Sequence, residues 1–288
     1  MKERLISSAV GLLVLAAVLL LSDTFVLPLI LGFIIAVILF ELSRAVGGDQ
    51  FRLALIGTLL YGFVQPFLVF FARLDIPALR VVSALLLPIC SICLFLEFLW
   101  HHGKYKIEQL AMMGAAMYFV TWSLTQLIIL KQSSETHGLL YLILGLGGAW
   151  IADSGAYFSG VFLGKRKLCP EISPKKTVEG FVGGLISNAV VFALIFVVYT
   201  YFDARVHMPG VPLTSLVNIP KAALLGLVCA PISVVGDLVF SVIKREKGIK
   251  DYGRIMPGHG GLTDRFDSVL FVVPAFSICI SLFPVLNY

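Results

Sequence analysis

Residues 241–267 read SVIKREKGIKDYGRIMPGHGGLTDRFD, and this polar segment lies between two long apolar runs. It holds six of the 22 Lys and Arg residues in the 288-residue chain, together with three aspartates, a histidine and a Gly-Gly pair. A charged side chain costs about 2.5 to 3.5 kcal/mol at the centre of a bilayer. Charges gathered beside membrane-spanning runs therefore indicate a functional site, and the 241–267 segment is the first candidate.

The rest of the chain has the composition of a membrane protein. It is 59% hydrophobic and 14% charged, whereas about a quarter of the residues in a soluble domain are charged. A helix needs about 20 apolar residues to cross a bilayer. These runs predict an all-α, polytopic integral membrane protein with about nine transmembrane helices, at residues 4–22, 25–45, 52–72, 78–100, 107–130, 139–160, 178–201, 219–243 and 268–286.

The first apolar run has some features of a signal peptide, because Lys2 and Arg4 precede it. It is too long for the apolar core of a signal peptide, however, and no small-x-small cleavage site follows it. We expect a retained helix.

The loops between these runs differ strongly in positive charge. With nine spans and a cytoplasmic N-terminus, 17 Lys and Arg residues fall on the cytoplasmic side and 5 on the other. Cytoplasmic loops carry the excess of Lys and Arg. The sequence therefore predicts an N-terminus in the cytoplasm and Tyr288 outside. The net charge of +5 is then a property of one membrane face and does not indicate a nucleic-acid partner.

Helical spacing brings several polar groups of the last two spans together. Asp237, Ser241 and Lys244 are spaced i, i+4, i+7 and share one helix face. Asp237 lies about 12 Å along the helix from the basic loop, within the cytoplasmic part of the bilayer. Asp264 and Asp267, spaced i, i+3, come just before the last span, where a helix N-terminus tolerates carboxylates well.

Asp153 falls near the cytoplasmic end of its own span, so we expect four aspartates at a similar depth. Clustered carboxylates repel one another unless a cation lies between them, and hard oxygen ligands favour Mg²⁺ or Mn²⁺. The nearby basic side chains, and the backbone N–H groups of the turn at His259, Gly260 and Gly261, suit a phosphate-rich ligand. This combination is typical of phosphoryl or nucleotidyl transfer.

Other interpretations of some of these groups stay open. Asp153 and Ser154 could be a polar pair that packs helices, and the basic residues 165–167 could only anchor the cytoplasmic face. His259 could serve the turn without transferring a proton. Glu41 and Glu97 lie at predicted helix ends beside Arg44 and His101, and we interpret both glutamates as interfacial groups.

Two other functions fit parts of the pattern. An ion-coupled transporter would also carry intramembrane aspartates, but they would be spread across the membrane depth. Another lipid-active phosphate transferase, such as a polyprenol kinase, is a third possibility. The sequence has no GxSxG or HExxH motif, and the run from Gly160 to Lys165 is one residue short of a P-loop. A serine hydrolase or a soluble-type NTPase is thus disfavoured.

The 241–267 segment resembles the signature of the bacterial phosphatidate cytidylyltransferases, also called CDP-diglyceride synthases. The matching residues are Ser241, Lys244, Arg245, Lys250, Asp251, Gly253, Pro257, His259, Gly260, Gly261, Asp264, Arg265 and Asp267. Residues 152–157, 172–177, 179–180 and 236–238 are also similar to that family. The likeness spans about residues 145–273, so we divide the chain into an accessory half, 1–135, and a catalytic half, 136–288.

The resemblance implies transfer of CMP from CTP to phosphatidic acid, which gives CDP-diacylglycerol and pyrophosphate for phospholipid synthesis. It also implies a homodimer in the bacterial inner membrane, with the active site facing the cytoplasm. Asp237, Asp264 and Asp267 match the metal-binding carboxylates of the family, which hold Mg²⁺, with a monovalent cation such as K⁺ beside it.

We therefore expect Asp237, Asp264, Asp267 and Lys244 to be catalytic. Lys244, Arg245 and Arg265 would bind phosphates, and Ser173 and Thr177 are expected also to cap the helix that begins at Val178. The expected substrate-binding residues are Asp153, Ser173, Lys175, Lys176, Thr177, Ser241, Arg245, Lys250, Asp251, His259, Gly260, Gly261 and Arg265.

Overall fold

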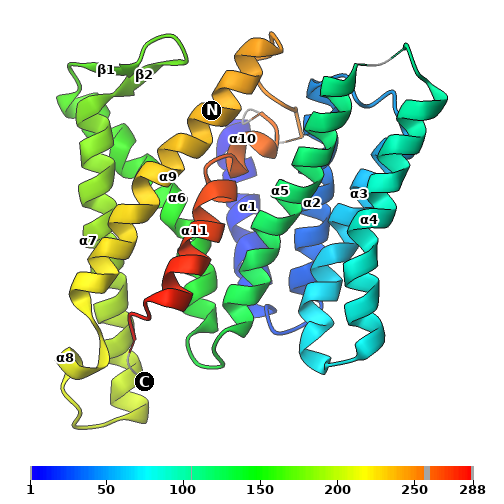
Figure 1. Ribbon diagram of the computed structural model, residues 1–288. Helices are drawn as coiled ribbons and strands as arrows, with labels where there is room; N and C mark the ends of the chain where they lie inside the picture. The colour runs from blue at the N-terminus through cyan, green and yellow to red at the C-terminus, as the bar shows by residue number, and fades with distance from the viewer. Residues whose placement is uncertain (1, 105, 256–259, 287–288) are drawn as a thin grey trace. The chain divides into compact units, whose positions relative to one another are not determined.

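The computed structural model describes residues 2–104, 106–255 and 260–286, which are mostly helical (Figure 1). Eight of the described helices are long and apolar enough to cross a membrane, which confirms the prediction of an all-α polytopic membrane protein. The long helices are α1 (Lys2–Leu20), α2 (Val26–Ala45), α3 (Arg52–Phe71), α4 (Pro77–Trp100), α5 (Ile107–Gln132), α6 (Gly138–Leu163), α7 (Val178–His207), α9 (Ile219–Glu246) and α11 (Val269–Leu282). The short elements are η1 (Ala72–Leu74), β1 (Lys167–Cys169), β2 (Ser173–Thr177), α8 (Leu213–Leu216) and α10 (Thr263–Phe266).

The largest departure from the expected spans is in α7, which continues to His207 instead of ending at residue 201. The first and last helices differ as well. The described apolar part of α1, Ala9–Leu20, is shorter than the eight spans that follow it. The last helix was expected to continue to residue 286, and this is wrong, because α11 ends at Leu282. Phe283 precedes a proline, which disfavours helical backbone there. Beyond it, Leu286 forms an antiparallel bridge with Val217.

The chain forms two compact units. The first consists of Met1–Leu139 and Ile243–Phe266, and the second of Leu140–Val242 and Asp267–Tyr288. Most of the 241–267 segment therefore belongs to the same unit as the first five long helices. The functional division at residue 135 stays a prediction.

The core of the first unit forms between α3, α4 and α5. Its buried residues include Phe51, Tyr61, Leu94 and Met113. At Gly62 of α3, an added Cβ would lie 2.5 Å from Leu39 Cδ1 of α2, so a glycine is needed for this close approach. Small residues allow such close helix packing within membranes, where lipid tails are as apolar as the side chains themselves.

In the second unit, α6 and α7 are joined by a short hairpin that the sequence did not predict (Figure 1). Strands β1 and β2 pair antiparallel, with Lys167 opposite Thr177. The Glu179 carboxylate accepts hydrogen bonds from the backbone N–H groups of Lys165 and Arg166, which fixes the start of the hairpin against the first turn of α7. Thr177 caps α7, since its hydroxyl oxygen accepts from Gly180 N at 3.1 Å. The cap prediction is confirmed for Thr177, whereas Ser173 begins β2.

Candidate active site

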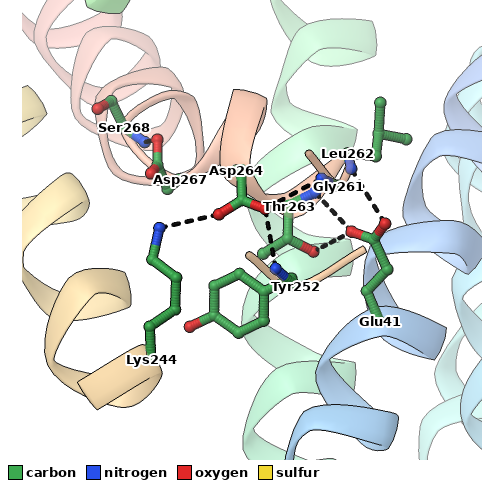
Figure 2. Close-up of polar contacts among 9 residues, drawn as sticks. All are labelled: Glu41, Lys244, Tyr252, Gly261, Leu262, Thr263, Asp264, Asp267 and Ser268. Atoms are coloured by element: carbon green, nitrogen blue, oxygen red, sulfur yellow. Dashed lines mark hydrogen bonds and ion pairs between the residues drawn. The ribbon is translucent and has the colours of Figure 1, made fainter. Parts of the chain in front are cut away.

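The carboxylate of Asp264, at the start of α10, accepts hydrogen bonds from three donors of the 241–267 segment (Figure 2). Lys244 Nζ of α9 donates to Oδ1 at 2.8 Å. The backbone N–H groups of Tyr252 and Gly261 donate to Oδ2 at 2.9 and 3.0 Å. Hydrogen bonds to a charged group are roughly twice as strong as neutral ones, so this carboxylate organises the loop around it. The structure thus brings the predicted residues Lys244, Gly261 and Asp264 together.

The turn before α10 depends on glycine. Gly260 has φ +86°, a left-handed conformation that L-residues with side chains rarely adopt. A Cβ at this position would lie 3.2 Å from Asp264 Oδ2 and 3.4 Å from Asp251 Oδ1. The two carboxylates therefore flank Gly260 closely. The predicted residues Pro257 and His259 lie outside the described residues.

Glu41 of α2 is part of this site, and the prediction that it is an interfacial group is wrong. The residue is only 1% exposed. Its carboxylate accepts hydrogen bonds from Leu262 N at 3.1 Å and from Thr263 N and Oγ1, each at 2.8 Å (Figure 2). One turn along α2, Arg44 donates to the backbone oxygen of Tyr252 at 2.9 Å. An ionisable residue within an apolar run was the available signal for a role of this kind.

The interfacial interpretation is also wrong for Glu97, which is 5% exposed. Its carboxylate accepts from Leu53 N at 2.7 Å and lies 3.2 Å from His101 Nδ1. Glu97 therefore fixes the start of α3.

In the second unit, the predicted metal ligand Asp237 pairs with a predicted substrate-binding residue. Lys176 Nζ of β2 lies 2.5 Å from Asp237 Oδ2 of α9. One turn earlier on α9, Ser233 donates to Asp153 Oδ1 of α6 at 2.9 Å. The hairpin, α6 and α9 thus each contribute polar side chains to one cluster.

Asp267 lies beside the same stretch of α9. It is 8% exposed, and its Oδ1 accepts from Ser268 N at 2.7 Å. A Cβ on Gly236 would lie 2.8 Å from the Asp267 backbone oxygen. A residue without a side chain is therefore needed immediately before Asp237, which explains the Gly-Asp pair in physical terms.

The remaining predicted residues lie nearer the surface. Ser173 and Ser241 are half-buried, and the side chains exposed to solvent are those of Lys175, Arg245, Lys250, Asp251 and Arg265. Long, exposed basic side chains of this kind can bind phosphate.

The donor chemistry of the three aspartates fits a hard divalent cation, because all three supply carboxylate oxygens. Among the described residues, no group of three or more His, Cys, Asp and Glu residues is arranged to hold a metal ion. Lysine ammonium groups accompany Asp237 and Asp264 instead. Asp264 belongs to the first unit and Asp237 and Asp267 to the second, so their convergence stays a prediction.

The sequence of this chain is similar to those of known proteins. Residues 2–283 match the model of the cytidylyltransferase family. The chain is 46% identical over 141 residues to a phosphatidate cytidylyltransferase of Haemophilus influenzae, covering 49% of this chain and 46% of that protein. It is 45% identical over 149 residues to the enzyme of that name in Bacillus subtilis, covering 52% and 50%. A third relative of the same name, in Staphylococcus saprophyticus, is 40% identical over 145 residues, or 50% of each chain.

These matches thus span about half the length of the curated relatives. The family model covers nearly the whole chain, including α2, α9 and the 241–267 segment. The chain belongs to the cytidylyltransferase family.

Proposed function

We propose that this protein transfers CMP from CTP to phosphatidic acid, giving CDP-diacylglycerol and pyrophosphate. The names of the three relatives support this substrate pair. The observation that carries the proposal is the geometry around Asp264, where Lys244 and two backbone N–H groups converge at the end of an apolar helix. A polar, phosphate-compatible site of this kind suits a reaction between a water-soluble nucleotide and a lipid.

The site lies on the cytoplasmic face of the bacterial inner membrane in this proposal, with the N-terminus also in the cytoplasm. The excess of Lys and Arg in the loops of that face supports this orientation. A two-chain lipid stays in the bilayer because each buried CH₂ contributes about 0.8 kcal/mol, and CTP stays in water. The two substrates can therefore meet at the level of the lipid headgroups.

The reaction is a direct displacement. A phosphate oxygen of phosphatidic acid attacks the α-phosphorus of CTP and forms a new P–O bond. The bond from this phosphorus to the β-phosphate oxygen breaks, and pyrophosphate leaves with the electron pair. The nucleophile is already an anion, so neither a covalent enzyme intermediate nor a general base is required.

The roles of the protein side chains are positioning and charge neutralisation. Lys244, Arg245 and Arg265 bind phosphate oxygens, and the hairpin residues Ser173, Lys175 and Lys176 hold one substrate beside them. The side chains of Asp237, Asp264 and Asp267 would hold Mg²⁺, which, when bound, neutralises charge on the triphosphate. A monovalent cation such as K⁺ beside it, and a homodimer, also belong to the proposal.

The test is an assay of the purified protein with radiolabelled CTP, Mg²⁺ and phosphatidic acid. A labelled lipid product that depends on phosphatidic acid is expected. Phosphate transfer to a polyprenol, or ion-driven substrate uptake into vesicles without a labelled lipid, would overturn the proposal.

A further inference from the structure

The Glu41 carboxylate lies within the loop that leads into α10, although 221 residues of sequence separate it from Leu262. Its Oε1 accepts from Leu262 N, and its Oε2 accepts from both the backbone and the hydroxyl of Thr263. Because Glu41 is only 1% exposed, these three donors replace the water molecules that would otherwise solvate its carboxylate. Figure 2 shows the side chain reaching from α2 to the backbone of residues 261–263.

Two glycines of the 241–267 segment provide the space that this carboxylate occupies. A Cβ on Gly253 would overlap Glu41 Oε1. A Cβ on Gly261 would lie 2.5 Å from Gly253 N and 2.7 Å from each oxygen of the Glu41 carboxylate. Neither glycine has positive φ, unlike Gly260, so their backbone conformations do not themselves require glycine. A side chain at Gly253 would therefore displace the Glu41 carboxylate, whereas one at Gly261 would meet both this carboxylate and the backbone of Gly253.

The backbone groups that form hydrogen bonds with side chains of α2 are close neighbours in sequence of the backbone groups that donate to Asp264. Gly261 N donates to Asp264, and the next N–H, of Leu262, donates to Glu41. Tyr252 N likewise donates to Asp264, while the Tyr252 carbonyl accepts from Arg44. The backbone at Gly261 and Leu262 thus forms hydrogen bonds with two carboxylates, those of Asp264 and Glu41.

We infer that Glu41 is a positioning residue for the cytidylyl transfer, fixing the loop backbone that holds the Asp264 carboxylate in its reactive orientation. The inference rests on the proposed function and extends the site into the half of the chain that we expected to be accessory. Glu41 does not touch substrate. It acts through the backbone of residues 261–263.

The test compares Glu41→Gln with Glu97→Gln. Both replacements change a buried carboxylate of the first unit into an amide of similar size. The hydrogen bonds described for Glu41 are to Leu262 and Thr263 of the loop, and the one described for Glu97 is to Leu53. Gln at position 41 keeps one acceptor oxygen, so its amide nitrogen faces the N–H donor of either Leu262 or Thr263 and repels it. Gln at position 97 keeps the acceptor for Leu53 N. Loss of a residue that orients a ligand-bearing group typically costs 10- to 100-fold in metal affinity or activity.

For Glu41→Gln we therefore expect kcat to fall about 10- to 100-fold and half-saturating Mg²⁺ to rise about 10-fold. Glu97→Gln should retain the wild-type kcat, KM and Mg²⁺ dependence. Equal behaviour of the two variants would overturn the inference.

A second readout needs no substrate or metal. Lys247, Lys250 and Arg254 are exposed, so trypsin cleavage after these residues reports how firmly the loop is held. Cleavage there should be at least about fivefold faster in Glu41→Gln than in wild type or Glu97→Gln, while cleavage in the hairpin after Lys165 or Lys175 stays unchanged. An unchanged rate at 247–254 would overturn the inference even in a protein with no transferase activity.

Gly253→Ala supplies an independent variant. Its methyl group would displace the Glu41 carboxylate, so it should give the same loss of kcat and the same faster cleavage as Glu41→Gln. Because both changes break one contact, the double variant should be no worse than either single variant. Losses that multiply in the double variant would show that Gly253 acts separately, and would contradict the inference. Absence of a labelled lipid product in the wild type would instead reject the proposed function, with the cleavage comparison still valid.

Discussion

Lys176 Nζ of β2 lies 2.5 Å from Asp237 Oδ2 of α9. The ammonium is shielded from solvent and forms no further hydrogen bond with any group that the structure describes. An ammonium carries three donors, so donors remain for phosphate oxygens that approach Asp237. The hairpin thereby places a positive charge directly beside an expected metal ligand.

Replacing Lys176 by Met should lower kcat/KM about 100-fold or more, because the charge beside Asp237 and a phosphate donor are lost together. Lys167→Met on β1 is the matched control, since Lys167 is exposed and belongs to the same hairpin. Liponucleotide synthesis by both variants at equal protein amounts gives the comparison. Equal losses in the two would mean that hairpin charge in general matters, rather than the pair with Asp237.

Asp264→Asn should lower turnover by about 100- to 1000-fold with the protein still inserted in the membrane. The amide cannot accept from Lys244, Tyr252 and Gly261 as a carboxylate does, and it would bind a cation more weakly. The control is Asp75→Asn, an exposed aspartate of the same unit that pairs with Arg80. Asp75→Asn should retain wild-type turnover, and near-normal turnover of Asp264→Asn would reject its role as a metal ligand.

The Lys244–Asp264 ion pair also predicts a stability effect. Their side chains are only 16% and 7% exposed. Removing one partner of a buried pair leaves an uncompensated charge and typically costs about 3 to 5 kcal/mol. Lys244→Met should therefore destabilise the protein by this amount and lower its melting temperature in detergent.

Adding Asp264→Asn to Lys244→Met should restore much of the lost stability without restoring activity, because no uncompensated charge then remains. Thermal unfolding followed by tryptophan fluorescence measures both variants. A double variant as unstable as Lys244→Met alone would show that the ion pair is not the cause.

The spans and the Asp264 cluster could be predicted from the sequence because their signals are local. Twenty apolar residues indicate a membrane helix wherever it packs, and Thr177 precedes a helix at the position where a hydroxyl caps it. Lys244 and Asp264 were predicted as phosphate and metal ligands from their residue types within one short segment. Helix spacing and residue chemistry were sufficient for the spans and for the Thr177 cap, and the ligand roles of Lys244 and Asp264 stay predictions.

The roles of Glu41 and of the hairpin could not be predicted in this way. The contact between Glu41 and Thr263 joins positions 222 residues apart. A carboxylate within an apolar run marks Glu41 as unusual, but it does not indicate the partner. The strands β1 and β2 are 3 and 5 residues long and carry prolines and lysines nearby, so they lack an alternating apolar pattern. The hairpin depends on backbone N–H groups that donate to Glu179, a tertiary contact that composition does not reveal.

The N-cap of α7 gives a prediction about stability alone. Thr177→Ala removes the acceptor for Gly180 N and should cost about 1 kcal/mol, whereas Thr177→Ser keeps the acceptor and should remain close to wild type. Melting temperatures in detergent distinguish the two. Equal destabilisation by Ser and Ala would mean that the methyl group, which packs near Gly164, matters more than the cap.

Removal of divalent ions tests the chemistry of the three aspartates. Treatment with EDTA should abolish liponucleotide synthesis, and added Mg²⁺ should restore it, because two phosphate-bearing anions cannot approach one another without positive charge between them. In Asp237→Asn, where one expected ligand is weakened, restoration should require about 10-fold more Mg²⁺ or more. Glu97→Gln again serves as the control, with the Mg²⁺ dependence of the wild type. Full activity in EDTA would mean that Lys176, Lys244 and the arginines of the 241–267 segment supply the required charge alone, and that the aspartates serve to position those cations.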